Sequence, residues 1–271
     1  FGVMGERPSH PELLDWLARH FVENEWDIAA TLKTMVMSRT YRQSSYLTPE
    51  LRQADPENRW LARAPRLKLP GNVLRDQALH SSGLLVEKIG GASVKPYQPA
   101  NLWREASIAT YKLDKGDALY RRSVYTYWKR TLSPPSMAVL DTADREWCSV
   151  KPKRTNTPLQ ALTLMNETAF FESARKLGER ILAEGGDTIE GRVEFAFRAV
   201  LSRTPSEREA TILADGWDKY LAECEKDPVL TKSMQNVGES KTPKDTDAIQ
   251  LCAATALANV ILNLEEATVR E

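Results

Sequence analysis

The sequence predicts a mainly α fold, a multi-helix domain with a small β-hairpin insertion. Most of the chain carries apolar residues at helical spacing behind helix-start signals, whereas one central stretch changes to a period of two. The 271 residues are 42% apolar and 27% charged, a composition that can bury a sizeable core. We expect a single domain over residues 1–271, and the opening Phe1-Gly2-Val3-Met4 predicts a fragment of a longer protein.

A helical hairpin is expected at the start of the chain. The pattern from Ser9 to Glu12 is typical of a capping box, and apolar residues at helical spacing follow it. Asp27, directly after the short link 24–26, can cap the second helix. Asp55-Pro56 predicts the start of a short helix, and Pro70 precedes a longer one.

A β-hairpin and an irregular basic stretch are expected within about residues 105–157. The two strands would cover Ser107 to Leu113 and Leu119 to Arg130, around a turn at Gly116. The second strand is rich in β-branched and aromatic residues, which pack well on a pleated surface. The stretch from Ser136 to Thr157 has no periodic pattern, so we expect it to be irregular.

The C-terminal half returns to helical spacing. Helix-start signals lie at Thr157-Pro158, at Asn166, at Asp187 or Thr188, and at Thr204 to Glu207. The polar stretch from Lys226 to Lys244 contains two prolines and predicts a mobile loop. Asp247 to Leu264 predicts a last amphipathic helix.

Several classes of function lack their sequence signals. The three cysteines, Cys148, Cys224 and Cys252, form no CxxC pair, and one long-range disulfide among them stays open. The three histidines form no HExxH or similar pair, so we expect no metal site and no cofactor in this chain. The net charge is zero and no run of about 20 apolar residues occurs, which argues against nucleic acid as a partner and against a transmembrane segment.

The segment between residues 120 and 155 is the one best suited to ligand binding. It contains eight Lys and Arg but three Asp and Glu. Guanidinium groups bind sulfate, phosphate or carboxylate bidentately, and aromatic faces stack on sugars or cations. The alternative is that these side chains cover a sheet and pair with acids of the fold. The candidate ligand-binding residues are Arg121, Arg122, Tyr127, Trp128, Arg130, Arg154 and Asn156.

Two carboxylates in the same segment, Asp141 and Asp144, are candidate catalytic residues. A pair of carboxylates can act as general acid and base on a glycosidic bond. Two Asp in a loop are more often turn or capping residues. Both interpretations stay open, and with them the choice between an enzyme and a binding domain.

An ordered series of motifs along nearly the whole chain resembles one protein family. The motifs are Gly2 to Gly5, Ser9 to Leu17, Ser38 to Ser45, Asp55 to Arg59, Leu74 to Asp76, Arg121 to Tyr125, Thr155 to Leu162 and Leu201 to Pro205. They resemble the C-terminal domain of unknown function of large secreted planctomycete and verrucomicrobial proteins with a cytochrome-c-like region. The chain departs from the family at Leu140 to Asp144, where the family string Phe-Asp-x-Pro-Asp keeps its two Asp but loses its Phe and Pro.

The resemblance implies a setting rather than a reaction. The family domain follows a cytochrome-c-like region, so a haem would be bound upstream and not by this chain. The protein would be exported, in the periplasm or the cell envelope. We therefore expect an accessory or interaction domain that binds anionic polysaccharide through the basic segment. The alternatives are a polysaccharide-active enzyme using Asp141 and Asp144, and a structural domain that docks the upstream cytochrome-c-like region.

Overall fold

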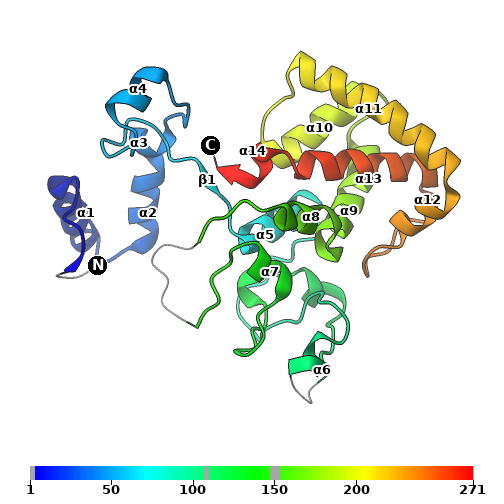
Figure 1. The fold of residues 1–271 in the computed structure, drawn as a ribbon, viewed down its shortest axis with the longest axis horizontal. Helices are drawn as coiled ribbons and strands as arrows, with labels where there is room; N and C mark the ends of the chain where they lie inside the picture. Colours follow the sequence, from blue (N-terminus) through cyan, green and yellow to red (C-terminus); the bar gives the residue numbers. More distant parts are fainter. Residues whose placement is uncertain (1–3, 107–109, 147–152, 271) are drawn as a thin grey trace. The chain divides into compact units, whose positions relative to one another are not determined.

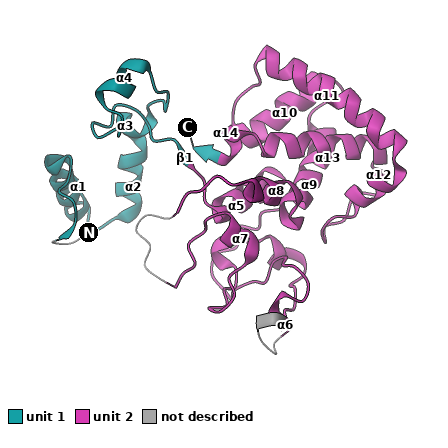
Figure 2. Ribbon diagram, viewed as in Figure 1, with its two compact units in different colours: residues 1–67, 269–271 teal, residues 68–268 magenta. Residues whose placement is uncertain are grey.

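The structure, a computed structural model, forms two compact units (Figures 1 and 2). Unit 1 is Phe1–Leu67 with Val269–Glu271, and unit 2 is Lys68–Thr268. The predicted mainly α fold is confirmed, and the single domain stays a prediction. The structure describes residues 4–106, 110–146 and 153–270. Ser107, where the first strand was expected to begin, and Trp147, Cys148 and Lys151 of the basic segment lie outside the described residues.

Unit 1 has short helices and little buried surface among its described residues. Its helices are α1 (Pro11–Glu23), α2 (Ile28–Met37), α3 (Arg39–Arg42) and α4 (Pro49–Ala54). Asp27 caps α2 as predicted, because its carboxylate accepts the N–H of Ala30. No residue of these helices is buried, and many of their apolar side chains are exposed.

Two predicted helix starts in unit 1 are wrong. The N-cap of α1 is His10, which makes no side-chain cap bond, and the Ser9 hydroxyl lies 3.0 Å from the His10 ring instead. Asp55 follows α4 rather than starting a helix. Its buried carboxylate accepts the N–H groups of Arg59 and Trp60 at 2.8 Å and so closes a turn.

Unit 2 contains the large core of the molecule. Its helices are α5 (Gly71–Ser81), α6 (Leu102–Ala106), α7 (Pro135–Val139), α8 (Pro158–Asn166), α9 (Thr168–Glu184), α10 (Ile189–Leu201), α11 (Glu207–Lys226), α12 (Pro228–Gln235), α13 (Ala248–Leu262) and α14 (Glu265–Thr268). The central pair is α9 and α13, and α10 and α11 pack against them (Figure 1). Gly178 lets the central pair approach closely, since a Cβ there would lie 2.9 Å from the Thr255 nitrogen.

Several helix starts predicted in the C-terminal half are confirmed, and others lie a few residues from the predicted position. Thr157 begins α8 through a capping box with Gln160, and Thr188 caps α10. Glu167, not Asn166, caps α9, and the second capping box joins Ser206 to Glu209. The expected loop 226–244 is wrong in part, because Asp227 caps the two-turn helix α12.

The expected position of the β-hairpin is wrong for the described residues. Residues 110–130 contain two 3-10 helices, η2 (Gly116–Tyr120) and η3 (Ser123–Tyr125), and isolated bridges to residues 86 and 94. The small sheet lies elsewhere, where β1 (Leu67–Lys68) pairs with β2 (Val269–Arg270). The period-two pattern misled because a buried arginine, not a neighbouring strand, takes the carbonyl groups of Leu119 and Arg121.

One disulfide joins two helices of the core. Cys224 of α11 and Cys252 of α13 are bonded, and both are buried. The sequence had left one long-range disulfide open, with no choice of partners. None of the described helices combines the length and the apolar character needed to cross a membrane.

Candidate functional site

Arg121 lies inside the fold rather than on its surface. Its guanidinium donates to the carbonyl groups of Lys88, Gly90 and Ala92 at 2.5–3.1 Å. It also stacks on Tyr125, with 3.8 Å from its central carbon to the ring centre. These contacts occupy the cation, so the predicted ligand-binding role does not match the position of Arg121.

The side chain of Arg75 binds backbone and side-chain atoms within residues 119–123. This buried residue of α5 donates to the carbonyl oxygens of Leu119 and Arg121 at 2.6 and 3.0 Å, and to the Ser123 hydroxyl at 3.1 Å. The neighbouring Asp76 accepts the N–H of Ser123 at 2.7 Å. Two of the sequence motifs, residues 74–76 and 121–125, are therefore joined by hydrogen bonds inside the fold.

Three of the predicted arginines remain on the surface, Arg122, Arg130 and Arg154. The side chain of Arg122 is 57% exposed and lies 3.9 Å from Asp76. The side chain of Arg130 is 84% exposed and pairs with Glu146 at 3.2 Å. Exposed pairs of this kind are weak, so both guanidinium groups can exchange their partner for a ligand oxyanion.

The two predicted stacking residues are partly covered. The ring of Tyr127 lies 5.9 Å from the ring of Trp103, and the Lys95 ammonium lies 5.4 Å from the Tyr127 ring centre. The central carbon of the Arg145 guanidinium lies 5.0 Å from the centre of the Trp128 ring. Cations already lie over both rings, so the aromatic part of the predicted patch serves cation–π contacts within the fold.

Asp141 is a hydrogen-bonded residue of the framework. Its Oδ2 atom accepts the N–H and the hydroxyl of Thr155 at 2.6 and 2.7 Å, and the side-chain amide of Gln160 at 3.0 Å. Burial alone would raise the pKa of this carboxyl. The bonds from Thr155 and Gln160, together with the charge of Lys68, outweigh burial and lower the pKa of Asp141.

The environment of Asp141 is not that of a general acid. A general acid needs a raised pKa, whereas the pKa of Asp141 is lowered. Asp144 is exposed, and its Oδ1 atom accepts the N–H of Glu146 at 3.0 Å, as turn residues do. The contacts of both residues fit the turn-and-capping interpretation, and the catalytic interpretation stays a prediction.

A basic pocket lies beside Asp141. It is lined by Lys68, Leu69, Pro70, Leu140, Asp141, Lys153 and Arg154, and we call it the Lys68 pocket. The half-buried Lys68 ammonium donates to two neutral oxygens, Gln160 Oε1 at 2.6 Å and Asn156 Oδ1 at 3.3 Å. Burial lowers the pKa of Lys68, and Asp141 opposes that shift.

The Lys68 pocket brings together some of the predicted site residues. Arg154 and Asp141 were singled out from the sequence, and both line this cavity of about 30 Å³. Asn156, also singled out, accepts a hydrogen bond from Lys68 beside it. Lys68 was missed because no local motif marks it and it lies far from the basic segment in sequence. Gln160 belonged to a quoted motif, but its side chain was given no role.

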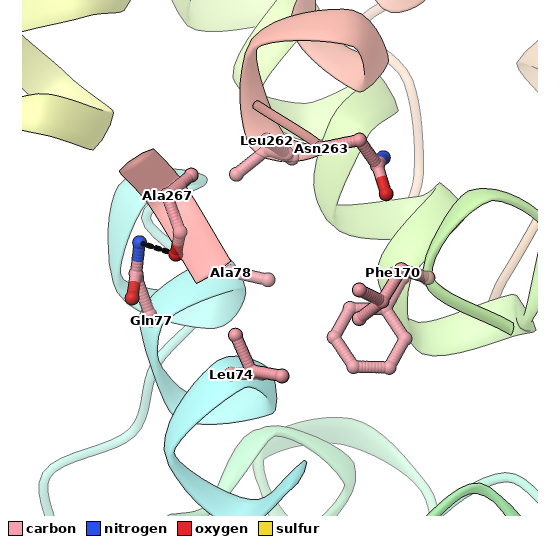
Figure 3. A pocket seen from close by; sticks show the side chains of 8 residues that line it. Leu74, Gln77, Ala78, Phe170, Leu262, Asn263 and Ala267 are labelled. Carbon is pink, nitrogen blue, oxygen red and sulfur yellow. Dashed lines mark hydrogen bonds between the residues drawn. The ribbon is translucent and has the colours of Figure 1, made fainter. Parts of the chain in front are cut away.

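Other enclosed spaces and polar clusters of unit 2 serve the fold. A cavity of about 20 Å³, room for about one water molecule, lies among Leu74, Ala78, Phe170 and Leu262, and Gln77 donates to Ala267 at its edge (Figure 3). No cluster of three or more potential metal ligands occurs within the described ranges.

A buried polar cluster surrounds Glu172 of α9. Its carboxylate accepts the hydroxyls of Tyr97 and Tyr120 at 2.8 and 2.9 Å and the N–H of Ser240 at 2.7 Å. Burial raises the pKa of Tyr120 to about 12. The fully buried Arg175 donates to Ser240 and Glu179, so this cluster fastens the segment after α12 to α9.

One family model matches residues 1–216, and its description is PSD1, a protein of unknown function (DUF1553). The match covers most of the chain. The chain belongs to the DUF1553 family. No curated protein and no solved structure matches the chain. DUF1553 membership confirms the coarser part of the resemblance, which is a domain of unknown function.

In this DUF1553 chain, the motif at residues 201–205 also makes hydrogen bonds that hold helices together. Arg203, within the motif 201–205, donates to both oxygens of Glu209 at 2.7 and 3.0 Å and to both oxygens of Glu266 at 2.6 and 2.8 Å. The bonds to Glu266 and Glu209 raise the pKa of Arg203. The motif thus joins the start of α11 to α14.

Proposed function

We propose that this DUF1553 chain is an interaction domain that binds acidic polysaccharide at the Lys68 pocket. The supporting observation is unpaired positive charge. Lys153 and Arg154 line the pocket, and neither makes an ion pair with a residue of the described chain. Lys68 adds a third cation, whereas Asp141 is the one carboxylate among the lining residues. A sulfate or carboxylate group would gain charge-assisted hydrogen bonds there.

The size of the pocket restricts how a polymer would bind. A cavity of about 30 Å³ admits one oxyanion group and no sugar ring. The polysaccharide would therefore insert one charged group and run over the surface, where Arg122 and Arg130 expose further guanidinium groups of unit 2. We further propose, from the resemblance, that the domain is an accessory part of an exported, cytochrome-c-containing cell-envelope protein whose haem is bound upstream.

Titration calorimetry with a sulfated galactan and with a polyuronate tests this function, and neutral dextran serves as the control polymer. We expect wild-type protein to bind the charged polymers and the Lys153→Ala/Arg154→Ala variant to bind at least tenfold more weakly. Affinity should fall with added salt, because the contacts are ionic. Arg198→Ala is the matched control, since Arg198 is an exposed arginine of unit 2 that pairs with Glu194 on its own helix. Absence of binding, or equal binding by the double variant, would overturn the proposal.

A second candidate function is the docking of the upstream cytochrome-c-like region. The observation that favours it is the apolar surface of unit 1, where the exposed fractions are 55% for Leu14, 64% for Trp26 and 66% for Ile28. Contiguous apolar surface on helices is typical of interaction faces. We propose that α1 and α2 would pack this surface against the cytochrome-c-like region.

Site-specific photo-crosslinking in the full-length protein tests the docking proposal. A photoreactive residue at Trp26 should crosslink to the cytochrome-c-like region, whereas one at the exposed Val229 of α12 should not. Crosslinks from position 26 to unit 2 of the same chain, or equal crosslinks from both positions, would contradict docking.

A further inference from the structure

Unit 1 contains an open hollow of about 1030 Å³ that is built from one short stretch of chain. Four arginines line it, together with neutral polar and apolar residues, and no Asp or Glu is among the lining residues. The lining is Arg42, Gln43, Ser44, Ser45, Tyr46, Leu47, Arg52, Asn58, Arg63, Ala64, Pro65 and Arg66, and we call it the arginine hollow. A hollow lined by arginines and by no acidic residue attracts anions.

Backbone and side-chain bonds fix the walls of the arginine hollow. The N–H of Ala64 donates to the carbonyl of Ser44 at 3.0 Å, and the amide of Gln43 donates to the carbonyl of Leu61 at 2.5 Å. Asn58 donates to the carbonyl of Arg63 at 2.7 Å. These bonds join the stretch after α3 to the stretch after α4, so the cations are held on an ordered frame.

Three arginines of the hollow, Arg42, Arg52 and Arg63, form no hydrogen bond to a carboxylate of the described chain. Arg63 is held by the carbonyl groups of Asp55 and Pro56, both at 2.9 Å, which position its guanidinium without using a carboxylate. The Asp55 carboxylate accepts the N–H groups of the turn, and the positive charge of Arg63 also interacts with it. The exposed Arg42 and Arg52 make no side-chain hydrogen bond or ion pair with the described part of the chain.

We propose that the arginine hollow is a second oxyanion-binding site, for a sulfated or carboxylated saccharide. Guanidinium forks bind sulfate and carboxylate oxygens bidentately. The Ser45 hydroxyl can meet sugar hydroxyls, and the Tyr46 ring, 73% exposed, offers a flat face to a sugar ring. The hollow is large enough for whole sugar residues, unlike the Lys68 pocket. In its ligand class this inference rests on the proposed function, but it uses a different site.

A sulfated disaccharide is the probe, and backbone amide shifts measured by NMR are the readout. We expect shifts at Ser44 to Tyr46 in wild-type protein and also in the Lys153→Ala/Arg154→Ala variant. The Arg42→Gln/Arg52→Gln variant should bind at least tenfold more weakly at those amides. Arg39→Gln, on the same helix as Arg42 but outside the lining, should bind like wild type.

The same titration separates this inference from the proposed function. In wild-type protein, an absence of shifts at Thr155 and Asn156 together with shifts at Ser44 to Tyr46 would count against the Lys68 pocket and for the arginine hollow. Unchanged Ser44 to Tyr46 amides in wild type, or equal affinity of the Arg42/Arg52 variant, would overturn the inference. Tighter binding of an oligonucleotide or an acidic peptide of equal charge would also overturn it. If the Arg42→Gln/Arg52→Gln variant unfolds, the single variant Arg52→Glu must show the same loss of binding at the Ser44 to Tyr46 amides.

Discussion

At the scale of single residues, buried arginines define much of unit 2. Arg75 supplies donors to the carbonyl groups of Leu119 and Arg121, which have no partner strand. Arg75→Lys would leave at least one of these buried acceptors unpaired, and each unpaired acceptor costs about 1–3 kcal/mol. We expect Arg75→Lys to lower the free energy of unfolding by about 3 kcal/mol in urea denaturation.

Arg122→Lys is the matched control for the Arg75 prediction, because Arg122 is exposed on the same segment. Surface substitutions usually change stability by less than about 0.5 kcal/mol. A stability of Arg75→Lys equal to that of Arg122→Lys would show that the buried guanidinium contributes little.

Glu209 should give the stability a measurable acid dependence. Its bonds to Arg203 and Ser206 lower its pKa to about 2, below the roughly 4.3 expected in the unfolded chain. A carboxyl whose folded pKa is lowered stabilises the fold above its unfolded pKa and loses that contribution as the pH falls toward the folded value. The contribution of Glu209 is therefore complete above pH 4.5 and disappears toward pH 2.

Glu209→Gln tests this acid dependence. The side chain is 35% exposed, and screening by solvent limits the expected loss at pH 7 to about 1 kcal/mol. Thermal melting between pH 2 and 7 should show the wild-type advantage over Glu209→Gln shrinking below pH 4.5. Glu207→Gln, two residues away in the same first turn of α11 and exposed, should keep the wild-type profile. A constant difference between wild type and Glu209→Gln at every pH would contradict the assignment.

At the scale of elements, the contact between α9 and α13 depends on Gly178. A Cβ at this position would lie 2.9 Å from the Thr255 nitrogen and 3.0 Å from the Ala254 carbonyl carbon, and backbone atoms cannot yield as a flexible side chain can. We expect Gly178→Ala to destabilise unit 2 by about 2 kcal/mol in urea denaturation.

Gly216→Ala on α11 is the opposite case. The nearest atom to its Cβ would be 3.6 Å away on the Tyr220 ring, an ordinary contact. Alanine is a better helix former than glycine, so this variant should gain up to about 1 kcal/mol. If both glycine variants shift stability in the same direction, the close approach of α9 and α13 is not the deciding factor.

Local signals predicted helices well and their partners poorly. Asp27, Thr157 and Thr188 act as caps because a cap is a contact within four residues of sequence. The hairpin failed because Arg75, more than 40 residues from Leu119 and Arg121, takes the carbonyl groups that a strand would have used. The Lys68 pocket was only partly predicted for the same reason. Arg154 lies in the basic segment, whereas Lys68 lies 88 residues before Asn156, to which it donates a hydrogen bond.

At the scale of the whole molecule, the two units differ in how they bury apolar surface. Unit 2 encloses a core around α9 and α13, fastened by the disulfide between α11 and α13. The helices of unit 1 bury no residue completely. The two proposed binding sites follow the same division, with the Lys68 pocket in unit 2 and the arginine hollow in unit 1.

The exposed apolar surface of unit 1 should make the protein self-associate near neutral pH. The formal net charge is zero at pH 7, positive at lower pH and negative at higher pH. Repulsion between molecules is therefore weakest near pH 7. Light scattering should therefore peak near pH 7. Replacing Leu14 and Ile28 with Gln should reduce the peak, because both are more than half exposed on α1 and α2. Val229→Gln, at a 79% exposed position of α12, should leave the peak unchanged. If Val229→Gln reduces the peak as much as the Leu14 and Ile28 substitutions do, the association is due to general hydrophobicity rather than to unit 1.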